Sequence, residues 1–272
     1  MPADRRAEID VPLRQRLARG DTLTGVFSFT GSSSVVELVA ATGYDFVLVD
    51  CEHAAVSPYG ALLENLVRAA DAGGACAIVR TPSVDRVAIT KALDAGAAAV
   101  LVPQVASADE ASRAVAAATR APQGSRGAAP MIRAGSYGSR AWPSFIAATR
   151  GPAVVGALVE SAAGVDAADE IAAVGGLGFL FFGAYDFALD LGVDDPAEVA
   201  AEVDEARSHV YAAALRAGIA IGDHAATAAQ ALALAAQGAQ LLTLAADVVV
   251  LARSLEAVLG EFRAGRAPRP TG

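Results

Sequence analysis

Cysteine is scarce in this sequence, and long apolar runs are missing. The 272 residues include only Cys51 and Cys76, too few for a disulfide framework, so we expect an intracellular, cytoplasmic protein. No uncharged apolar run reaches the roughly 18 residues that a membrane-spanning helix requires. Residues 1–8 carry charge, but no apolar segment follows them, so we expect no signal peptide.

Positive charge is also in short supply. The chain has 21 Lys and Arg against 30 Asp and Glu, a net charge of −9, and nucleic-acid binding needs a basic face. We therefore expect neither a nucleic-acid partner nor a membrane partner. Apolar residues make up 54%, enough for a sizeable core. No domain boundary is visible, so we predict a single domain over 1–262 and a flexible tail over 263–272.

Short apolar runs alternate with Ala- and Leu-rich stretches of helical spacing. The runs have strand length and are nearly continuously apolar, which is typical of strands buried on both faces. The predicted strands are 24–29, 46–49, 76–79, 99–102, 154–159, 179–182, 219–221 and 241–244, and the clearest helices are 59–72, 108–119, 198–217 and 227–237. Residues 122–138 are predicted to be a long ordered loop.

Eight strand–helix units in one domain favour a (β/α)8 TIM barrel, an α/β fold with parallel strands. The rival is an open doubly wound sheet. That fold usually has a Gly-x-Gly-x-x-Gly turn after its first strand, whereas residues 31–34 read Gly-Ser-Ser-Ser.

Polar residues follow most of the predicted strands, where a barrel enzyme carries its chemistry. They are Asp50, Cys51, Glu52 and His53 after the second strand, Arg80 at the third, Gln104 after the fourth, Glu160 at the fifth, Asp186 after the sixth, and Asp223 and His224 after the seventh. In a closed barrel these ends meet at one rim, so the set predicts a site there. Chance capping is the alternative, and Asp223 could cap the helix that follows it.

Glu160 and Asp186 are the natural metal-binding pair because they follow adjacent strands. Two carboxylates with positions left for water and substrate suit Mg²⁺ or Mn²⁺, whereas zinc would favour more His or Cys. Alternatively, each carboxylate caps the helix that follows it.

His53 and Arg80 are the candidate proton-transfer and anion-binding groups. Asp50 could orient His53 as a general base, and Arg80 could donate to a carboxylate or enolate oxygen. The alternatives are a loop histidine without a task and an Arg80 salt bridge to Asp85 or Asp94.

Six motifs in order carry a resemblance to a known family. They are GYDFVLVDCEHA at 43–54, IVRTP at 78–82, KALDAGAAAVLVPQV at 91–105, PQGSRG at 122–127, ALVES at 157–161 and FFGAYDFALDLGV at 181–193. Together they resemble the HpcH/HpaI family of class II, metal-dependent pyruvate aldolases. The resemblance covers residues 12–255.

The resemblance implies a carbon–carbon lyase that reversibly cleaves a 4-hydroxy-2-oxo acid to pyruvate, or a similar 2-oxo acid, and an aldehyde through a metal-stabilised enolate. It implies that Glu160 and Asp186 hold the divalent ion, Mg²⁺ or Mn²⁺ first, with Co²⁺ or Zn²⁺ as alternatives. It also implies a homo-oligomer, a hexamer built as a trimer of domain-swapped dimers.

By the same resemblance, His53 oriented by Asp50 serves the proton transfer, and Arg80 contacts the keto oxygen. The implied substrate-binding set is Arg80, Gln104, Gly183, Ala184, Tyr185 and Asp186, whose backbone N–H groups near Tyr185 would hold the carboxylate. A Schiff base is not needed, which agrees with Lys91 being the sole lysine, on a predicted helix.

Some positions depart from the family pattern. Cys51 stands where Gly is common, and Leu158 stands where many relatives have Gln, which puts the substrate in question more than the reaction class. A decarboxylase of oxaloacetate that forms a carbon–carbon bond on the same site is one alternative. A non-catalytic 2-oxo-acid-binding protein is another, although such a protein would not need the base pair.

Overall fold

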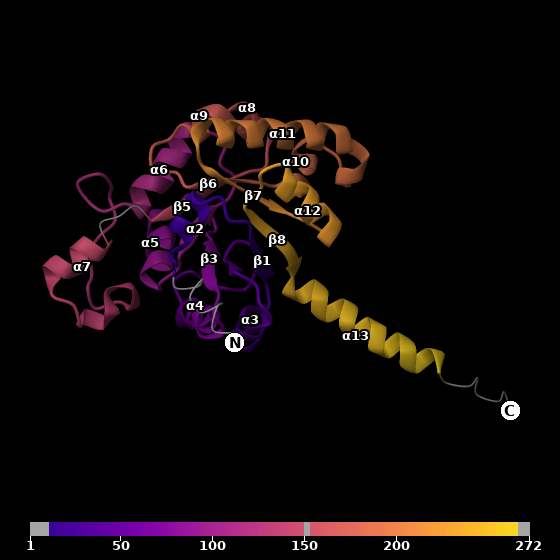
Figure 1. Ribbon diagram of the computed structural model, residues 1–272, viewed down its shortest axis with the longest axis horizontal. Coiled ribbons are helices and arrows are strands. Elements are labelled where there is room, and N and C mark those ends of the chain that lie inside the picture. The colour runs from indigo at the N-terminus through magenta and orange to yellow at the C-terminus, as the bar shows by residue number, and fades with distance from the viewer. Residues whose placement is uncertain (1–10, 150–152, 266–272) are drawn as a thin grey trace.

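Eight parallel strands close into a barrel in sequence order, with the first strand paired to both the second and the eighth. The computed structural model describes residues 11–149 and 153–265, and Figure 1 shows helices wrapped around the strands. The strands are β1 (Leu23–Ser28), β2 (Phe46–Asp50), β3 (Cys76–Arg80), β4 (Ala99–Val102), β5 (Val154–Val159), β6 (Phe179–Phe182), β7 (Ala220–His224) and β8 (Leu241–Ala246). The predicted (β/α)8 barrel is confirmed.

Helices follow the strands and cover the outside of the barrel. They are α2 (Leu13–Ala18), α3 (Ser33–Thr42), α4 (Ala61–Gly73), α5 (Arg86–Asp94), α6 (Ala108–Ala118), α7 (Trp142–Thr149), α8 (Ala162–Asp166), α9 (Ala168–Ala172), α10 (Ala184–Asp190), α11 (Ala200–Ala217), α12 (Ala228–Ala236) and α13 (Asp247–Ala264), with 3₁₀ turns η1 (Arg133–Gly138) and η2 (Pro196–Val199). No helix of the described ranges is long and apolar enough to cross a membrane.

The strands are apolar throughout because both of their faces are buried. In β2, Phe46 and Leu48 belong to a cluster inside the barrel, and Val47 and Val49 pack in the layer between the barrel and its helices. Large and small residues alternate inside. This packing explains why an uninterrupted apolar run, rather than an alternating one, marks each strand.

Several element boundaries differ from the sequence-based expectations, and three of the differences fall at polar or proline-containing edges. β7 reaches His224, whereas the predicted strand ends at 221, and the predicted helix over 198–217 is divided into η2 and α11. The predicted loop over 122–138 ends in a short 3₁₀ turn, because η1 forms from Arg133. Each of these three differences concerns a polar or proline-containing edge, where apolar periodicity carries no signal.

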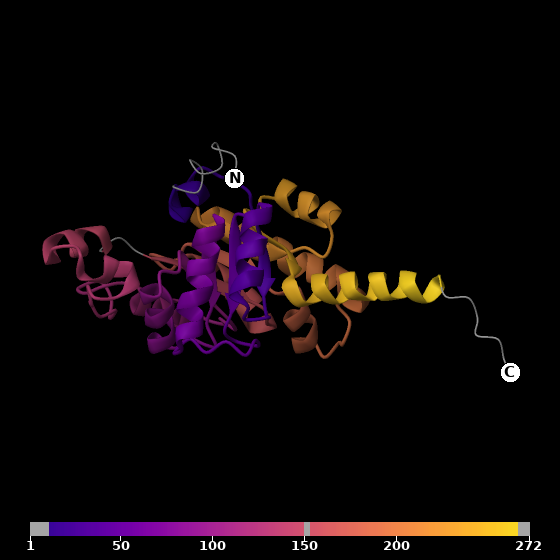
Figure 2. The ribbon, with the colours of Figure 1, turned by 90° about the horizontal axis from the view of Figure 1, so that it is seen from below.

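Two segments project from the barrel on opposite sides. Figures 1 and 2 show α7 on one side and α13 extending away on the other. In α13 only Asp247 is buried, and every residue from Val248 to Gly265 is exposed. α13 also runs past residue 262, where the predicted domain ends, and residues 266–272 of the predicted tail lie outside the described part of the chain.

Candidate active site

Asp50 and Arg80 form a buried ion pair at the barrel rim. They end β2 and β3 and are direct partners in the register of the two strands. Arg80 Nε donates to Asp50 Oδ1 and Arg80 Nη2 donates to Asp50 Oδ2, each at 2.9 Å. This two-pronged geometry fixes the guanidinium plane, and Arg80 Nη1 is left to face Glu52 Oε2 at 3.3 Å.

The structure corrects the expected role of Asp50. Its carboxylate also accepts the backbone N–H groups of Glu52 at 2.9 Å and His53 at 3.3 Å, so it holds the turn after β2 and not the His53 ring. The His53 imidazole Nε2 lies 3.7 Å from Glu52 Oε2, and the side chain is 58% exposed. Glu52, which the sequence motif contains but which no expectation singled out, is therefore the carboxylate beside His53.

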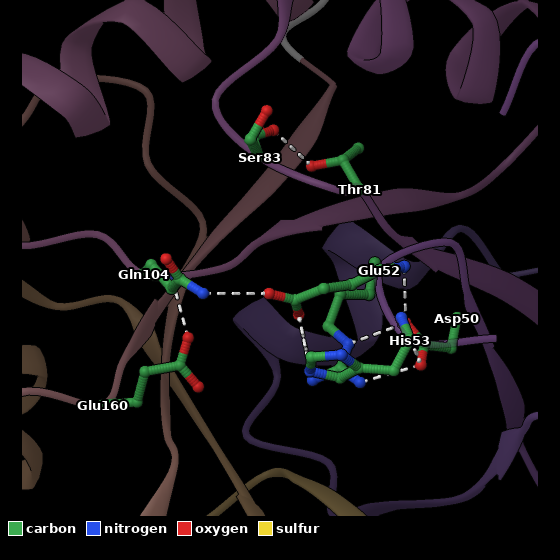
Figure 3. A network of polar contacts seen from close by, with 8 residues as sticks. Asp50, Glu52, His53, Thr81, Ser83, Gln104 and Glu160 are labelled. Carbon is green, nitrogen blue, oxygen red and sulfur yellow. Dashed lines mark hydrogen bonds and ion pairs between the residues drawn. The ribbon is translucent and has the colours of Figure 1, made fainter. Parts of the chain in front are cut away.

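Gln104 links two carboxylates of the site, as Figure 3 shows. Its backbone N–H donates to Glu160 Oε1 at 2.7 Å, and its side-chain Nε2 donates to Glu52 Oε1 at 3.3 Å. Gln104 adopts a left-handed backbone conformation, with φ at +54°. That conformation is uncommon outside glycine, and here it accompanies an N–H that donates to the Glu160 carboxylate.

Glu160 sits in a strongly anionic environment. The pKa of its carboxyl is raised to about 8, first by burial and then by the negative charges of Asp186 and Glu52, while the Gln104 N–H and Arg80 act in the opposite direction. Gly183 makes the close approach possible, because a Cβ there would lie 2.7 Å from Glu160 Cβ and 2.9 Å from Glu160 Oε2.

Glu160 does not cap its helix, and Arg80 forms a salt bridge at the barrel mouth, as its alternative role predicts, but with Asp50 and Glu52 as partners. Ser161 rather than Glu160 caps α8, by accepting the Gly164 N–H at 3.1 Å. Arg80 pairs with neither of its two alternative partners: Asp85 caps α5, and Asp94 pairs with Arg126. The polar residues at the strand ends thus converge on one rim, as the barrel geometry requires.

A cavity of about 450 Å³ joins the carboxylate pair to an aromatic chamber. Its polar wall includes His53, Arg80, Glu160, Asp186 and His224, together with Gly183, Ala184 and Tyr185. Phe27, Phe29, Phe181 and Phe182 line the remainder. A second, polar cleft, lined by Glu52, Gln104, Glu160 and Asp186 among others, adjoins the same carboxylates. Of the predicted substrate-binding residues, Gln104 lies in this cleft and the other five line the cavity.

The residues present fit a hard divalent cation. Within the described residues, no three His, Cys, Asp or Glu side chains form a closed ligand set, but Mg²⁺ is usually held by one or two carboxylates with water and substrate in its other positions. The pKa of Glu160 is raised first by burial and then by the negative charges of Asp186 and Glu52, and a bound cation would stabilise the ionised carboxylate against both effects. Glu52 Oε2 is also buried with no hydrogen-bond partner among the residues described. Glu160 and Asp186 would be the ligands of the divalent cation.

Comparisons with known proteins agree with this site. The model of the HpcH/HpaI aldolase/citrate lyase family matches residues 23–254. The hydroxypyruvate/pyruvate aldolase of Paraburkholderia phytofirmans is 34% identical over 258 residues, which cover 93% of this chain and 97% of the relative.

Two solved structures extend the likeness to three dimensions. An HpcH/HpaI aldolase/citrate lyase family protein from Burkholderia cenocepacia has a TM-score of 0.85 at 34% identity, covering 92% of this chain and 98% of its own. The citrate synthase SbnG has a TM-score of 0.82 at 30% identity, covering 93% and 98%. The chain belongs to the HpcH/HpaI aldolase/citrate lyase family, and it is a carbon–carbon lyase.

Proposed function

We propose that this protein is a divalent-metal-dependent aldolase that reversibly cleaves a 4-hydroxy-2-oxo acid to pyruvate, or a similar 2-oxo acid, and an aldehyde. The observation that carries the proposal is the placement of Arg80 and the Glu160–Asp186 pair on the wall of one cavity. A 2-oxo acid needs both elements, because its oxygens require a cation and its developing enolate requires a fixed hydrogen-bond donor. The likeness to the hydroxypyruvate/pyruvate aldolase of Paraburkholderia phytofirmans supports the same reaction class.

Glu160 and Asp186 would hold Mg²⁺ or Mn²⁺. When bound, such a cation supplies Lewis-acid polarisation of a carbonyl oxygen. Arg80 has three N–H groups beyond the two that Asp50 engages, and they can contact the keto oxygen without a change in the guanidinium plane. Because Asp50 holds that plane through two hydrogen bonds, Arg80 is already oriented when the substrate arrives.

The substrate carboxylate and the transferred proton also have candidate groups. α10 begins after Gly183, and no side chain of the described residues caps it, so its first backbone N–H groups can donate to a carboxylate near Tyr185. His53 is exposed beside Glu52 and can pass a proton between solvent and the cavity. Glu52 then takes the orienting position that the sequence predicts for Asp50.

The first test is proton–deuterium exchange at the methyl group of pyruvate, followed by NMR in D₂O. We expect exchange with Mg²⁺ or Mn²⁺ and none after chelation, because enolate formation requires the cation and Arg80 together. This measurement isolates the first half-reaction, so it needs no knowledge of the aldehyde.

Folded protein that shows no exchange with any divalent metal would contradict the proposed reaction and favour a binding protein. Oxaloacetate serves as a second probe. Its consumption in the absence of an aldehyde would favour the decarboxylase alternative.

We also propose that the protein assembles as a homo-oligomer through α13. Val248, Leu251, Leu255 and Val258 recur at spacings of three and four, so they share one helix face, and Leu255 and Val258 are 70% and 69% exposed. Full burial of each such side chain contributes about 1.5–3 kcal/mol. The projecting helix shown in Figures 1 and 2 would bury this face on a second copy of the chain, as expected for domain-swapped dimers.

The combined variant Leu255→Asp, Val258→Asp is expected to dissociate the oligomer, because two carboxylates would have to be buried at the interface. Sedimentation velocity at micromolar concentration measures the change. Arg253→Asp is the matched control, since residue 253 lies on the opposite face of α13. An unchanged mass for the double variant, or a monomeric parent protein, would rule out α13 as the interface.

A further inference from the structure

His224 lies in the wall of the cavity, but the proposed reaction gives it no role. It ends β7 and lines the same cavity as Glu160, Asp186 and Arg80. Its ring stands between two aromatic rings, with centroids 6.1 Å from Phe27 and 6.5 Å from Tyr185. Phe27 in turn has the Arg80 guanidinium over its face at 5.3 Å. His224 is therefore packed into the site and is not a loose surface residue.

The hydrogen bonds around His224 favour one tautomer. Its Nδ1 lies 3.0 Å from Thr243 Oγ1, and the Thr243 hydroxyl donates to the Asp223 carbonyl at 3.4 Å. Since that hydroxyl proton is already used, Thr243 Oγ1 accepts from Nδ1–H of the imidazole. The neutral ring then carries its lone pair on Nε2, which makes no hydrogen bond to any residue in the described ranges.

The surroundings keep this ring neutral. Burial lowers the pKa of His224, and its hydrogen bonding to Thr243 only partly opposes that effect. The nearest carboxylate along the chain, Asp223, accepts hydrogen bonds from Arg207 Nε at 3.0 Å and Tyr211 Oη at 2.8 Å. Its other oxygen accepts the His224 backbone N–H at 2.7 Å. Asp223 is thus fully engaged and does not pair with the imidazole.

Aromatic rings and charged groups share the cavity wall around His224. Phe27, Phe29, Phe181 and Phe182 line it together with carboxylates such as Glu160 and Asp186. A neutral acceptor in this wall can take a hydrogen bond from a neutral hydroxyl group without adding a further negative charge to the site. Sites built to hydrogen-bond a hydroxyl discriminate strongly against analogues that lack it.

We propose that His224 Nε2 accepts a hydrogen bond from a hydroxyl group of the bound substrate and thereby selects hydroxylated over unsubstituted substrates. The inference rests on the proposed aldolase function and deepens it. The hydroxyl can be carried by C3 of the 2-oxo acid or by the carbon next to the aldehyde. Thr243 is the positioning residue, because it holds the proton on Nδ1.

The three histidines of the chain make the tautomer directly measurable. In protein labelled with ¹⁵N-histidine, spectra of His53→Gln, His209→Gln and His224→Gln assign each ring. We expect the His224 ring to carry its proton on Nδ1, and its Nε2 resonance to shift when hydroxypyruvate or glycolaldehyde binds but not with pyruvate or acetaldehyde. A proton on Nε2, or no selective shift from either hydroxylated ligand, would overturn the proposal. This readout needs no turnover, so it separates failure of the inference from failure of the proposed reaction.

Kinetics provide the second arm. The ratio of kcat/KM for glycolaldehyde over acetaldehyde, with pyruvate, is compared with the ratio for hydroxypyruvate over pyruvate, with one aldehyde. In His224→Leu we expect one of these two kcat/KM ratios to fall about tenfold, namely the ratio for the substrate whose hydroxyl contacts His224. His224→Gln keeps an acceptor near the Nε2 position, so we expect it to retain most of that preference. His209→Leu, an exposed site in α11, is the control. The ratio that falls identifies which substrate carries the hydroxyl.

The role of Thr243 is tested separately from its packing. Thr243→Val removes the acceptor for Nδ1–H, so we expect the proton to redistribute between the ring nitrogens and the preference to weaken. Thr243→Ser keeps the hydroxyl and should restore both. A merely structural Thr243 would leave the ¹⁵N pattern of His224 the same in both variants.

Discussion

Glu160→Gln is expected to abolish divalent-cation binding and to reduce metal-dependent exchange of pyruvate protons by at least about 100-fold. The amide keeps the size of the side chain and can still accept the Gln104 N–H that Glu160 Oε1 accepts at 2.7 Å. What it removes is the negative charge, which leaves Asp186 as the single carboxylate of the proposed metal-binding pair. One carboxylate is a poor cation site unless the substrate supplies the remaining ligands.

Titration calorimetry with Mn²⁺ and the exchange assay measure the two effects independently. Asp190→Asn is the matched control, because Asp190 lines the same polar cleft and accepts the Ala162 N–H at 2.7 Å, which an amide oxygen can also accept. We expect this control to bind the cation normally. Unaltered Mn²⁺ affinity in Glu160→Gln would refute the assignment of Glu160 as a ligand.

Asp50→Ala should lower the free energy of unfolding by about 3–5 kcal/mol, because the buried Arg80 guanidinium loses both hydrogen bonds to Asp50 and keeps only Glu52 Oε2, at 3.3 Å, as an anionic neighbour. Asp50 and Arg80 are 0% and 8% exposed as side chains, so water cannot replace the lost carboxylate. The backbone N–H groups of Glu52 and His53 lose their acceptor in the same step. Catalysis should fall as well, since the guanidinium plane is no longer held.

Urea unfolding followed by circular dichroism measures the loss. The control is Asp109→Ala, which removes an Arg113 partner at 3.0 Å in a pair whose side chains are 56% and 80% exposed, and exposed pairs contribute at most about 1 kcal/mol. Equal losses of unfolding free energy in the two variants would mean that the buried Asp50–Arg80 pair stabilises the fold no more than an exposed pair does.

The metal pair illustrates what strand positions predict about a site. Glu160 directly follows β5 and Asp186 lies in the first turn of α10, after β6, so sequence order alone places both at the rim once a parallel barrel is inferred. Arg80 follows by the same reasoning. Which side chains these groups pair with does not follow from strand order, because Asp50 could have faced His53, Arg80 or solvent from the same position.

Glu52 and His224 show where a sequence pattern stops being informative. Glu52 stands between Asp50 and His53, and a turn residue of this kind gives no indication of its side-chain direction. It enters the site because Asp50 holds the turn and Gln104 adopts a positive φ beside it. His224 has a defined tautomer only because Thr243, on the neighbouring strand β8, reaches its Nδ1.

The linear sequence by itself determined the barrel, since eight doubly buried strands must be continuously apolar and a parallel arrangement brings their carboxyl ends to one rim. It also determined which charged residues reach that rim. The tertiary structure alone decided which of those groups pair with each other, which nitrogen of His224 faces the cavity, and that α13 leaves the barrel. These features depend on side-chain directions and on contacts between residues far apart in the chain, and local apolar periodicity carries no information about either.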